Sequence, residues 1–277
     1  MIARHLAPLH QASRHFIARW RARERESATT GRHIEAAVVM LVCGFIVWVA
    51  WYGDLRAAVA VRDISDAWRG PFQRVNMLGE SGWLFAVSAF LVAGALLARH
   101  RGLGRRVDAA LGLLAGRAFF VFAVLAVSGL LSLIVKSLFG RARPRLLDMV
   151  GPFHFDMFSV KSSLLSFPSG HAVTAFGAAS AIAFLAPRLG WPAFFLAVMV
   201  GVARVVTGAH FPSDVIAGMA LGVATTIILR RAFAARGIVF RHTDRGVALR
   251  GAGLVAPLLR QAFRRRDVGK SIERSAV

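Results

Sequence analysis

Long apolar runs separated by short polar links dominate the pattern of this chain. A helix that crosses a bilayer needs about 20 mostly apolar residues, and six segments reach or approach that length. They are residues 34–52, 83–98, 118–135, 171–186, 191–207 and 215–229. The second, fourth and sixth are short, so we expect their ends to extend into the flanking links. The pattern predicts an all-α integral membrane protein built as a six-transmembrane-helix bundle.

The polar links predict how this bundle is oriented. Arginine and lysine gather before residue 34, between the second and third spans, in the turn at Arg188 and after residue 229. Such an excess is typical of cytoplasmic segments, and an even number of spans places both termini on that side. We therefore expect three parts: a basic cytoplasmic segment (1–33), a six-span domain (34–230) and a basic cytoplasmic tail (231–277).

Short interfacial helices are expected beside the spans. In the charge-balanced outer link, Val61, Ile64 and Trp68 recur at helical spacing among charged residues, which is typical of a helix lying in the membrane interface. Phe16, Ile17 and Trp20 suggest another, and the tail stretch 247–263 is expected to lie on the surface. Ala58-Val59-Ala60 resembles a signal-peptide cleavage site, but the long basic and apolar segments before it favour a retained anchor.

Composition supports a membrane protein. Of the 277 residues 56% are hydrophobic and 18% charged, with a formal net charge of +21, whereas soluble domains average about 45–50% apolar and about 25% charged residues. Basicity alone could indicate nucleic-acid binding, but the arginines flank apolar runs, so anionic membrane lipids are the expected partners and no nucleic acid is expected. The single cysteine, Cys43, excludes an intrachain disulfide.

One outer link breaks the charge pattern. Residues 136–170 carry five cations, Lys136, Arg141, Arg143, Arg145 and Lys161, against Asp148 and Asp156. An excess of positive charge on the side that usually lacks it indicates either that the predicted topology is inverted or that these cations have a fixed anionic partner. Arg141 and Arg145 are expected to contact lipid phosphates.

Three polar clusters flank the spans at that same side. They cover residues 136–144, 167–171 and 203–214. The third and fifth spans run outward while the fourth and sixth begin outside, so all three clusters should meet at one membrane face.

Their chemistry is that of a phosphate site. Lys136, Arg143 and Arg204 are donors suited to phosphate oxygens. Ser169 and Gly170 precede a helix, whose N-terminal N–H groups bind anions.

Two histidines complete these clusters. An aspartate such as Asp214 can hold Nδ1–H of His210 and leave Nε2 free to attack, while His171 can donate a proton to a leaving oxygen. The alternative is a purely structural role, in which His210 and Asp214 form a structural pair and the cations lie at the edges of the spans. A metal site of His154, His171, His210 and Asp214 is disfavoured by three converging cations, so no metal is expected.

The three clusters resemble the signature of the type 2 phosphatidic acid phosphatase superfamily, Lys-x6-Arg-Pro, Pro-Ser-Gly-His and Ser-Arg-x5-His-x3-Asp. Lys136 to Pro144 and Pro168 to His171 match in full. Arg204, His210 and Asp214 match with intact spacing, but Ala203 replaces the serine. Residues 79–83, Gly-Glu-Ser-Gly-Trp, also resemble a segment found in members of this family.

The resemblance implies a metal-independent phosphatase that acts through a phosphohistidine on His210 and needs no cofactor. It implies that Asp214 orients His210, that His171 protonates the leaving group, and that five residues bind the phosphoryl oxygens. These are Lys136, Arg143, Ser169, Gly170 and Arg204.

We expect a lipid phosphatase in a bacterial inner membrane with its site facing the periplasm. Candidate substrates are undecaprenyl pyrophosphate, phosphatidate or phosphatidylglycerol phosphate, and a lipid A-type glycolipid. Two alternatives stay open: a catalytically silent membrane binder of phosphorylated lipid, and a membrane-tethered nucleic-acid binder that uses the basic tail.

Overall fold

The computed structural model describes residues 33–99, 104–244 and 246–251. The chain forms two compact units, one up to Trp48 and one from Val49 onward. The described part of the first unit belongs to an apolar helix that runs His33–Tyr52 and continues into the second unit. Expected segments at residues 16–20 and 252–263 lie outside the described residues.

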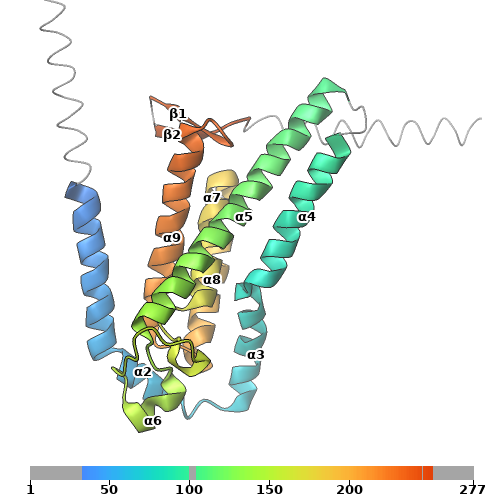
Figure 1. Ribbon diagram of the computed structural model, residues 1–277. Coiled ribbons are helices and arrows are strands. Elements are labelled where there is room, and N and C mark those ends of the chain that lie inside the picture. The colour runs from blue at the N-terminus through green and yellow to red at the C-terminus, as the bar shows by residue number, and fades with distance from the viewer. Residues whose placement is uncertain (1–32, 100–103, 245, 252–277) are drawn as a thin grey trace, which may run out of the picture. The chain divides into compact units, whose positions relative to one another are not determined.

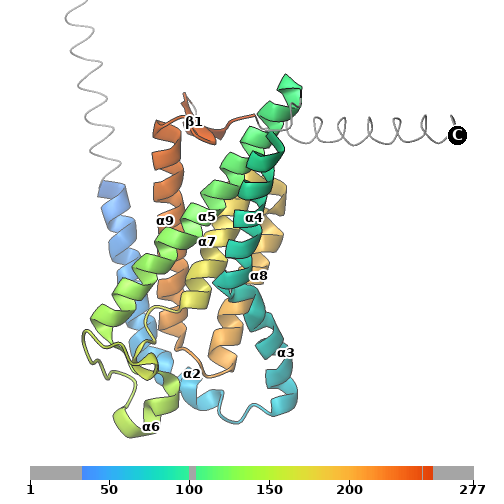
Figure 2. The same cartoon turned by 45° about the vertical axis from the view of Figure 1, so that its right-hand side comes forward.

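The second unit is mostly helical (Figures 1 and 2). Its longer helices are α2 (Asp54–Ala60), α3 (Asp66–Asn76), α4 (Ser81–Arg99), α5 (Arg105–Phe139), α7 (Gly170–Leu185), α8 (Gly190–Val206) and α9 (Pro212–Ala235). Short pieces join them: the helix α6 (Leu147–Val150) and four 3₁₀ turns, η1 (Met77–Gly79), η2 (Pro144–Leu146), η3 (Ser162–Leu164) and η4 (Pro187–Leu189). The short helix expected around Val61, Ile64 and Trp68 is not continuous: Val61 and Ile64 lie in the turn between α2 and α3, and only Trp68 is helical, in α3.

Within the described residues, five helical stretches are long and apolar enough to cross a membrane: His33–Tyr52, Asp66–Arg99, Arg105–Phe139, Pro187–Val206 and Pro212–Ala235. They contain five of the six predicted spans. The remaining segment forms α7, which is apolar but has only 16 residues. The structure thus supports an integral membrane protein with five candidate spans.

The helix α7 lies at the centre of the unit, against α5, α8 and α9. It is rich in alanine and glycine, and most of its residues are buried. Gly218 and Gly222 allow α9 to approach closely: an added Cβ would lie 2.6 Å from the Ser169 carbonyl oxygen and 2.5 Å from that of Val173. Small residues at such spacing let helix backbones pack tightly, which fixes the start of α7 against the start of α9.

A glycine ends α5 just beyond Lys136. Gly140 has φ +57° and its N–H bonds to the Lys136 carbonyl oxygen, a left-handed helix end that favours glycine. An added Cβ would lie 1.6 Å from the Asp156 carbonyl oxygen. Gly140 therefore turns the chain sharply into the loop that carries Arg141 and Arg143.

A small antiparallel hairpin corrects the all-α expectation. The strands β1 (Phe240–Thr243) and β2 (Gly246–Leu249) pair Phe240 with Leu249. Phe240 is buried against Phe120, with the ring centroids 4.9 Å apart. Two four-residue strands are too short to give a periodic signal in the sequence, and packing on α5 and α9 stabilises them here.

Candidate functional site

The predicted site residues come from five places in the chain and meet at one end of the helix bundle. Lys136 lies in the last turn of α5, Ser169, Gly170 and His171 begin α7, Arg204 lies in the last turn of α8, and His210 and Asp214 flank the start of α9. Arg143 lies in the loop after α5.

Backbone hydrogen bonds join these segments directly. The Ser169 N–H donates to the Asp214 carbonyl oxygen at 2.9 Å, and the His210 N–H donates to the Arg204 carbonyl oxygen at 3.1 Å. The Arg143 N–H donates to the Ser163 carbonyl oxygen at 3.0 Å. The loops that carry the polar side chains are therefore held by the ends of the packed helices.

Lys136 reaches across to the segment that precedes α7. Its Nζ donates to the Leu165 carbonyl oxygen at 2.9 Å, and its Cε lies 3.6 Å from the position of an added Cβ on Gly170. The ammonium keeps donors for a second acceptor, since Nζ has three protons.

The cationic side of the site has polar atoms without protein partners. In the described part of the chain, Nε of Arg143, Nε of Arg204 and Oγ of Ser169 are buried and have no hydrogen-bond partner. Burial lowers the pKa of Arg143, with a smaller contribution from the nearby charge of Arg145. Buried donors are normally satisfied, so these atoms fit a ligand with several oxygen acceptors, such as a phosphoryl group.

His210 is buried, with 3% of its side chain exposed. Burial lowers its pKa to about 4, although Asp214 opposes that shift. A neutral imidazole has one free nitrogen lone pair. At neutral pH His210 is therefore uncharged and able to act as a nucleophile.

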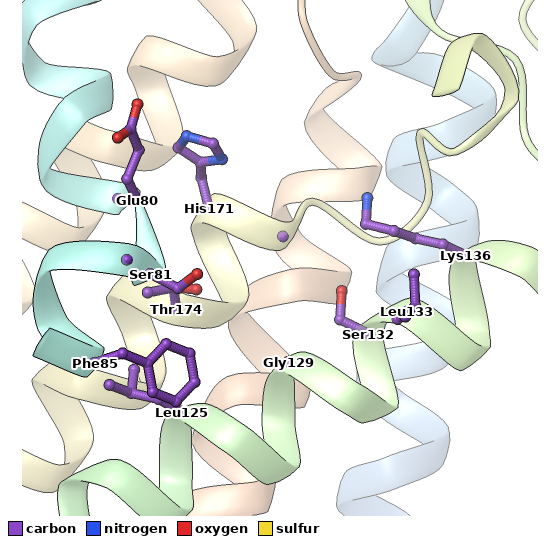
Figure 3. Close-up of a pocket in the computed structure, with 13 residues that line it drawn as sticks. Glu80, Ser81, Phe85, Leu125, Gly129, Ser132, Leu133, Lys136, His171 and Thr174 are labelled. Carbon is purple, nitrogen blue, oxygen red and sulfur yellow. The ribbon is translucent and has the colours of Figure 1, made fainter. Parts of the chain in front are cut away.

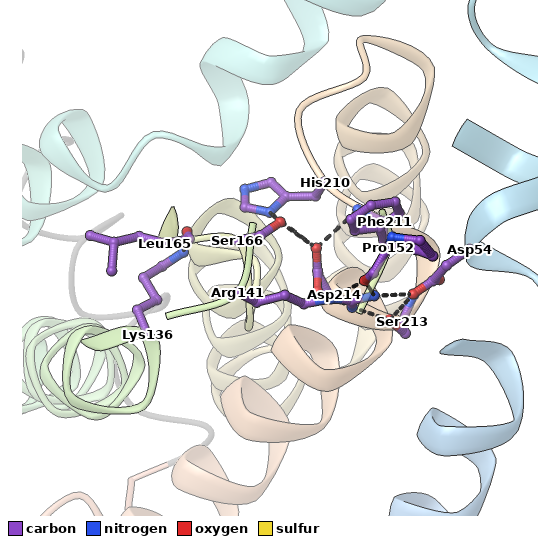
Figure 4. Close-up of polar contacts among 10 residues, drawn as sticks. All are labelled: Asp54, Lys136, Arg141, Pro152, Leu165, Ser166, His210, Phe211, Ser213 and Asp214. Atoms are coloured by element: carbon purple, nitrogen blue, oxygen red, sulfur yellow. Dashed lines mark hydrogen bonds and ion pairs between the residues drawn. The ribbon is translucent and has the colours of Figure 1, made fainter. Parts of the chain in front are cut away.

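The expected direct bond between Asp214 and His210 is replaced by a contact through Ser166 (Figure 4). Oδ2 of Asp214 is 3.7 Å from Nδ1 of His210, which is beyond hydrogen-bond distance. Ser166 Oγ lies 3.4 Å from Nδ1 of His210 and donates to Oδ2 of Asp214 at 2.6 Å. Ser166 lies two residues before Pro168, and that proximity is the only sequence signal that could have identified it.

Asp214 is also fixed from its own helix. It is the third residue of α9, and its Oδ2 accepts the N–H of Phe211 at 2.9 Å. A carboxylate at this position that accepts the N-cap N–H is half of a capping box. This hydrogen bond from its own helix holds the Asp214 carboxylate independently of any contact with His210.

Arg141 corrects one expectation, because it does not face lipid. Its side chain is 3% exposed and binds Asp214 and Asp54, whose side chains are fully buried. Asp54 was not predicted, because a single aspartate just after an apolar run carries no signal of a partner 87 residues away. Burial raises the pKa of Asp54, and the hydrogen bonds from Ser213 and Arg141 oppose that shift.

A cavity of about 390 Å³ adjoins the site (Figure 3). Lys136, Gly170 and His171 line its polar end, and Phe85, Leu125 and Leu133 contribute apolar surface from α4 and α5. Glu80 also lines it. The cavity combines an anion-binding end with an apolar wall.

Comparison with known proteins identifies the family. The model described as the PAP2 superfamily matches residues 117–238, which include every predicted site residue. A lipid A 1-phosphatase from Rhizobium etli is 34% identical over 168 residues, which are 61% of this chain and 72% of that protein. The chain belongs to the PAP2 superfamily.

Other PAP2 relatives extend this similarity. A lipid A 1-phosphatase from Rhizobium johnstonii is 39% identical over 127 residues, 46% of this chain, and the match spans about half (52%) of that protein. A solved PAP2-type phosphatidylglycerolphosphate phosphatase from Bacillus subtilis is 22% identical with a TM-score of 0.49, covering 71% of this chain and 96% of that one. The family resemblance in the three motifs is confirmed, and the named relatives are lipid phosphatases.

Proposed function

We propose that this chain is an integral membrane phosphatase that removes a phosphoryl group from a membrane lipid. The observation that carries the proposal is the meeting of a buried His210 with Lys136, Arg143 and Arg204 at one end of the bundle. The class of the named relatives, lipid phosphatases, supports it.

The proposed reaction has two displacements at phosphorus. Nε2 of His210 attacks, the bond from phosphorus to the leaving oxygen breaks, and His171, in its imidazolium form, gives its proton to that oxygen. Water then attacks the phosphohistidine, His171 takes a proton from the water, and the P–N bond breaks to release phosphate. Lys136, Arg143, Arg204, Ser169 and the N–H groups at Gly170 would stabilise the negative charge in both transition states.

The substrate we favour is a phosphorylated glycolipid of the lipid A type, since both Rhizobium relatives are named lipid A 1-phosphatases. Undecaprenyl pyrophosphate and phosphatidate or phosphatidylglycerol phosphate remain the competing substrates. The cavity suits a lipid in general, because polar groups at one end adjoin apolar side chains.

We further propose six spans, with α7 as the sixth and the site on the periplasmic side of a bacterial inner membrane. The helix α7 is shorter than about 20 residues, but its burial among α5, α8 and α9 means that it meets protein rather than lipid. The cluster of Arg99, Arg105 and Arg106 lies at the opposite end of α4 and α5 from Lys136, as the positive-inside rule requires.

The test is phosphate release by the purified protein from a panel of these lipids, with EDTA present. We expect turnover on at least one lipid, strongest for the lipid A-type phosphate, and its loss in His210→Ala. If the wild-type protein binds these lipids but releases no phosphate, the silent-binder alternative is correct. If His210→Ala keeps its rate, the nucleophile is wrong.

A further inference from the structure

The site rests on a buried ionic cluster behind it, made of Asp54, Arg141, Ser213 and Asp214 (Figure 4). Arg141 Nη1 donates to Asp214 Oδ1 at 2.7 Å, and Nη2 donates to Asp54 Oδ2 at 2.8 Å. One guanidinium therefore bridges two carboxylates, one from the start of α2 and one from the first turn of α9.

Every nitrogen of this guanidinium has a partner. Nη1 also donates to Ser213 Oγ at 2.7 Å, and Nε and Nη2 both donate to the Pro152 carbonyl oxygen. The guanidinium carbon lies 4.5 Å from the centroid of the Phe211 ring. Arg141 thus has no donor left for a phosphate, unlike Arg143 and Arg204.

Asp54 is tied to the start of α9 a second time. The Ser213 N–H donates to its Oδ1 at 3.0 Å, and Ser213 Oγ donates to its Oδ2 at 2.5 Å. Asp54 thereby fixes both Arg141 and the helix turn that carries Asp214.

From Asp214 the contacts continue to the nucleophile. Arg141 occupies Oδ1, so Oδ2 is left to accept from Ser166, whose Oγ faces Nδ1 of His210. Oδ2 also accepts the Phe211 N–H, so Arg141 supplies the second anchor of the carboxylate. Without it, one hydrogen bond from the backbone would be left to hold the angle at which Oδ2 meets Ser166.

Resting on the proposed function, we infer that Arg141, held by Asp54, is a positioning residue that acts through Asp214 and Ser166 to orient His210. It fixes the carboxylate, the carboxylate fixes the hydroxyl, and the hydroxyl accepts Nδ1–H so that Nε2 faces the phosphoryl group. It touches neither the substrate nor the cavity.

A purely structural role is the competing explanation, since a buried ion pair also joins α2 to α9. Removing one partner of such a pair leaves an uncompensated buried charge and destabilises the fold. The double variant Asp54→Asn/Arg141→Met reduces this problem, because it removes one charge of each sign and leaves Asp214 the hydrogen bonds from Ser166 Oγ and the Phe211 N–H. It therefore separates positioning from folding.

In the double variant we expect the melting temperature in detergent to stay near that of the wild type and KM to change less than about twofold. We expect kcat to fall about 10- to 100-fold, as is typical when an orienting partner is lost. The matched control is Arg62→Met/Asp148→Asn, which removes an exposed ion pair (2.8 Å); its kcat should be unchanged. A folded Asp54→Asn/Arg141→Met protein with wild-type kcat would overturn the inference.

A spectroscopic readout separates this inference from the proposed function. Nitrogen NMR of labelled histidines, with His210 assigned by comparison with His210→Ala, reports which ring nitrogen carries the proton. We expect Nδ1–H in the wild type and a mixture of tautomers in the double variant, whether or not the lipid tested is a substrate. The same single tautomer in both proteins would reject the positioning role even if the wild type were an active phosphatase.

Discussion

At the scale of single residues, burial decides what each titratable group can do. His210 would be mostly charged below its ordinary pKa of about 6.5, but burial lowers that pKa to about 4. The nucleophilic, uncharged form therefore persists over a wider acidic range than in an exposed histidine.

This shift predicts the acid limb of the pH profile. Because protonation of His210 would remove the proposed nucleophile, kcat/KM should hold as pH falls from 7 to 5 and decline only toward pH 4. The measurement is kcat/KM against pH for two substrates whose phosphates ionise differently, so that substrate ionisation can be recognised. A fall of kcat/KM with a midpoint near pH 6.5 for both substrates would contradict an uncharged, buried His210.

His171 predicts a dependence on the leaving group. An alkoxide needs a proton from His171 more than the phosphate that leaves a pyrophosphate does. We expect His171→Ala to lower kcat on a lipid phosphate monoester by about 100-fold or more, and to lower it less on a lipid pyrophosphate.

The control for this prediction is Lys136→Met, which removes a phosphoryl-binding charge that both substrates need. It should slow the two reactions by similar factors. Equal losses on both substrates in His171→Ala would argue against proton donation to the leaving oxygen.

At the scale of elements, the contact between α7 and α9 positions the chemistry. The first turns of both helices carry site residues, and Gly218 and Gly222 let the backbones approach. At Gly222 an added methyl would meet backbone atoms, 2.5 Å from the Val173 oxygen and 2.9 Å from the Gly177 nitrogen. Backbone atoms cannot change rotamer as a side chain can, so α7 and α9 would have to move apart.

Gly222→Ala should therefore destabilise the protein by about 1–3 kcal/mol, the usual cost of overpacking, and lower activity because the starts of α7 and α9 move apart. Thermal unfolding in detergent and kcat measure the two effects. The matched control is Gly94→Ala in α4, where an added Cβ has no atom within 4 Å. There we expect unchanged or slightly higher stability, because alanine is the better helix former. If Gly222→Ala and Gly94→Ala had the same unfolding temperature and the same kcat, the close contact between α7 and α9 would not be important for stability or activity.

At the scale of the whole molecule, α5 relates the site to the membrane. From Arg105 to Lys136 it rises roughly 46 Å at 1.5 Å per residue, close to the full thickness of a bilayer with its headgroups, about 40–45 Å. A helix of this length carries the arginines at its start to one surface and Lys136 to the other.

Cysteine labelling tests the proposed orientation. In a Cys43→Ser background, Val160→Cys places a thiol on the loop beside the site and Trp191→Cys places one at the opposite end, both at well-exposed positions. A membrane-impermeant maleimide applied to the periplasmic side of intact cells should label position 160 and not 191. Labelling of 191 alone would show that the orientation is inverted.

The sequence by itself determined the helical membrane character and most residues of the proposed phosphate site. Apolar runs and flanking arginines are local signals, and the motif residues from Lys136 to Asp214 have fixed spacings that can be read directly. Even their meeting at one face follows from the order and direction of the spans.

Only the tertiary structure decided which groups support the nucleophile. Arg141 looked like a lipid-facing cation, Asp54 carried no signal and Ser166 was one more loop serine, because pairings across 44 to 87 residues leave no periodic trace. The hairpin at residues 240–249 was not predicted because its strands have only four residues each, too few for a periodic pattern. A charge in a sequence is only a residue type; burial and the atoms packed around it determine whether it binds a ligand or holds another side chain in place.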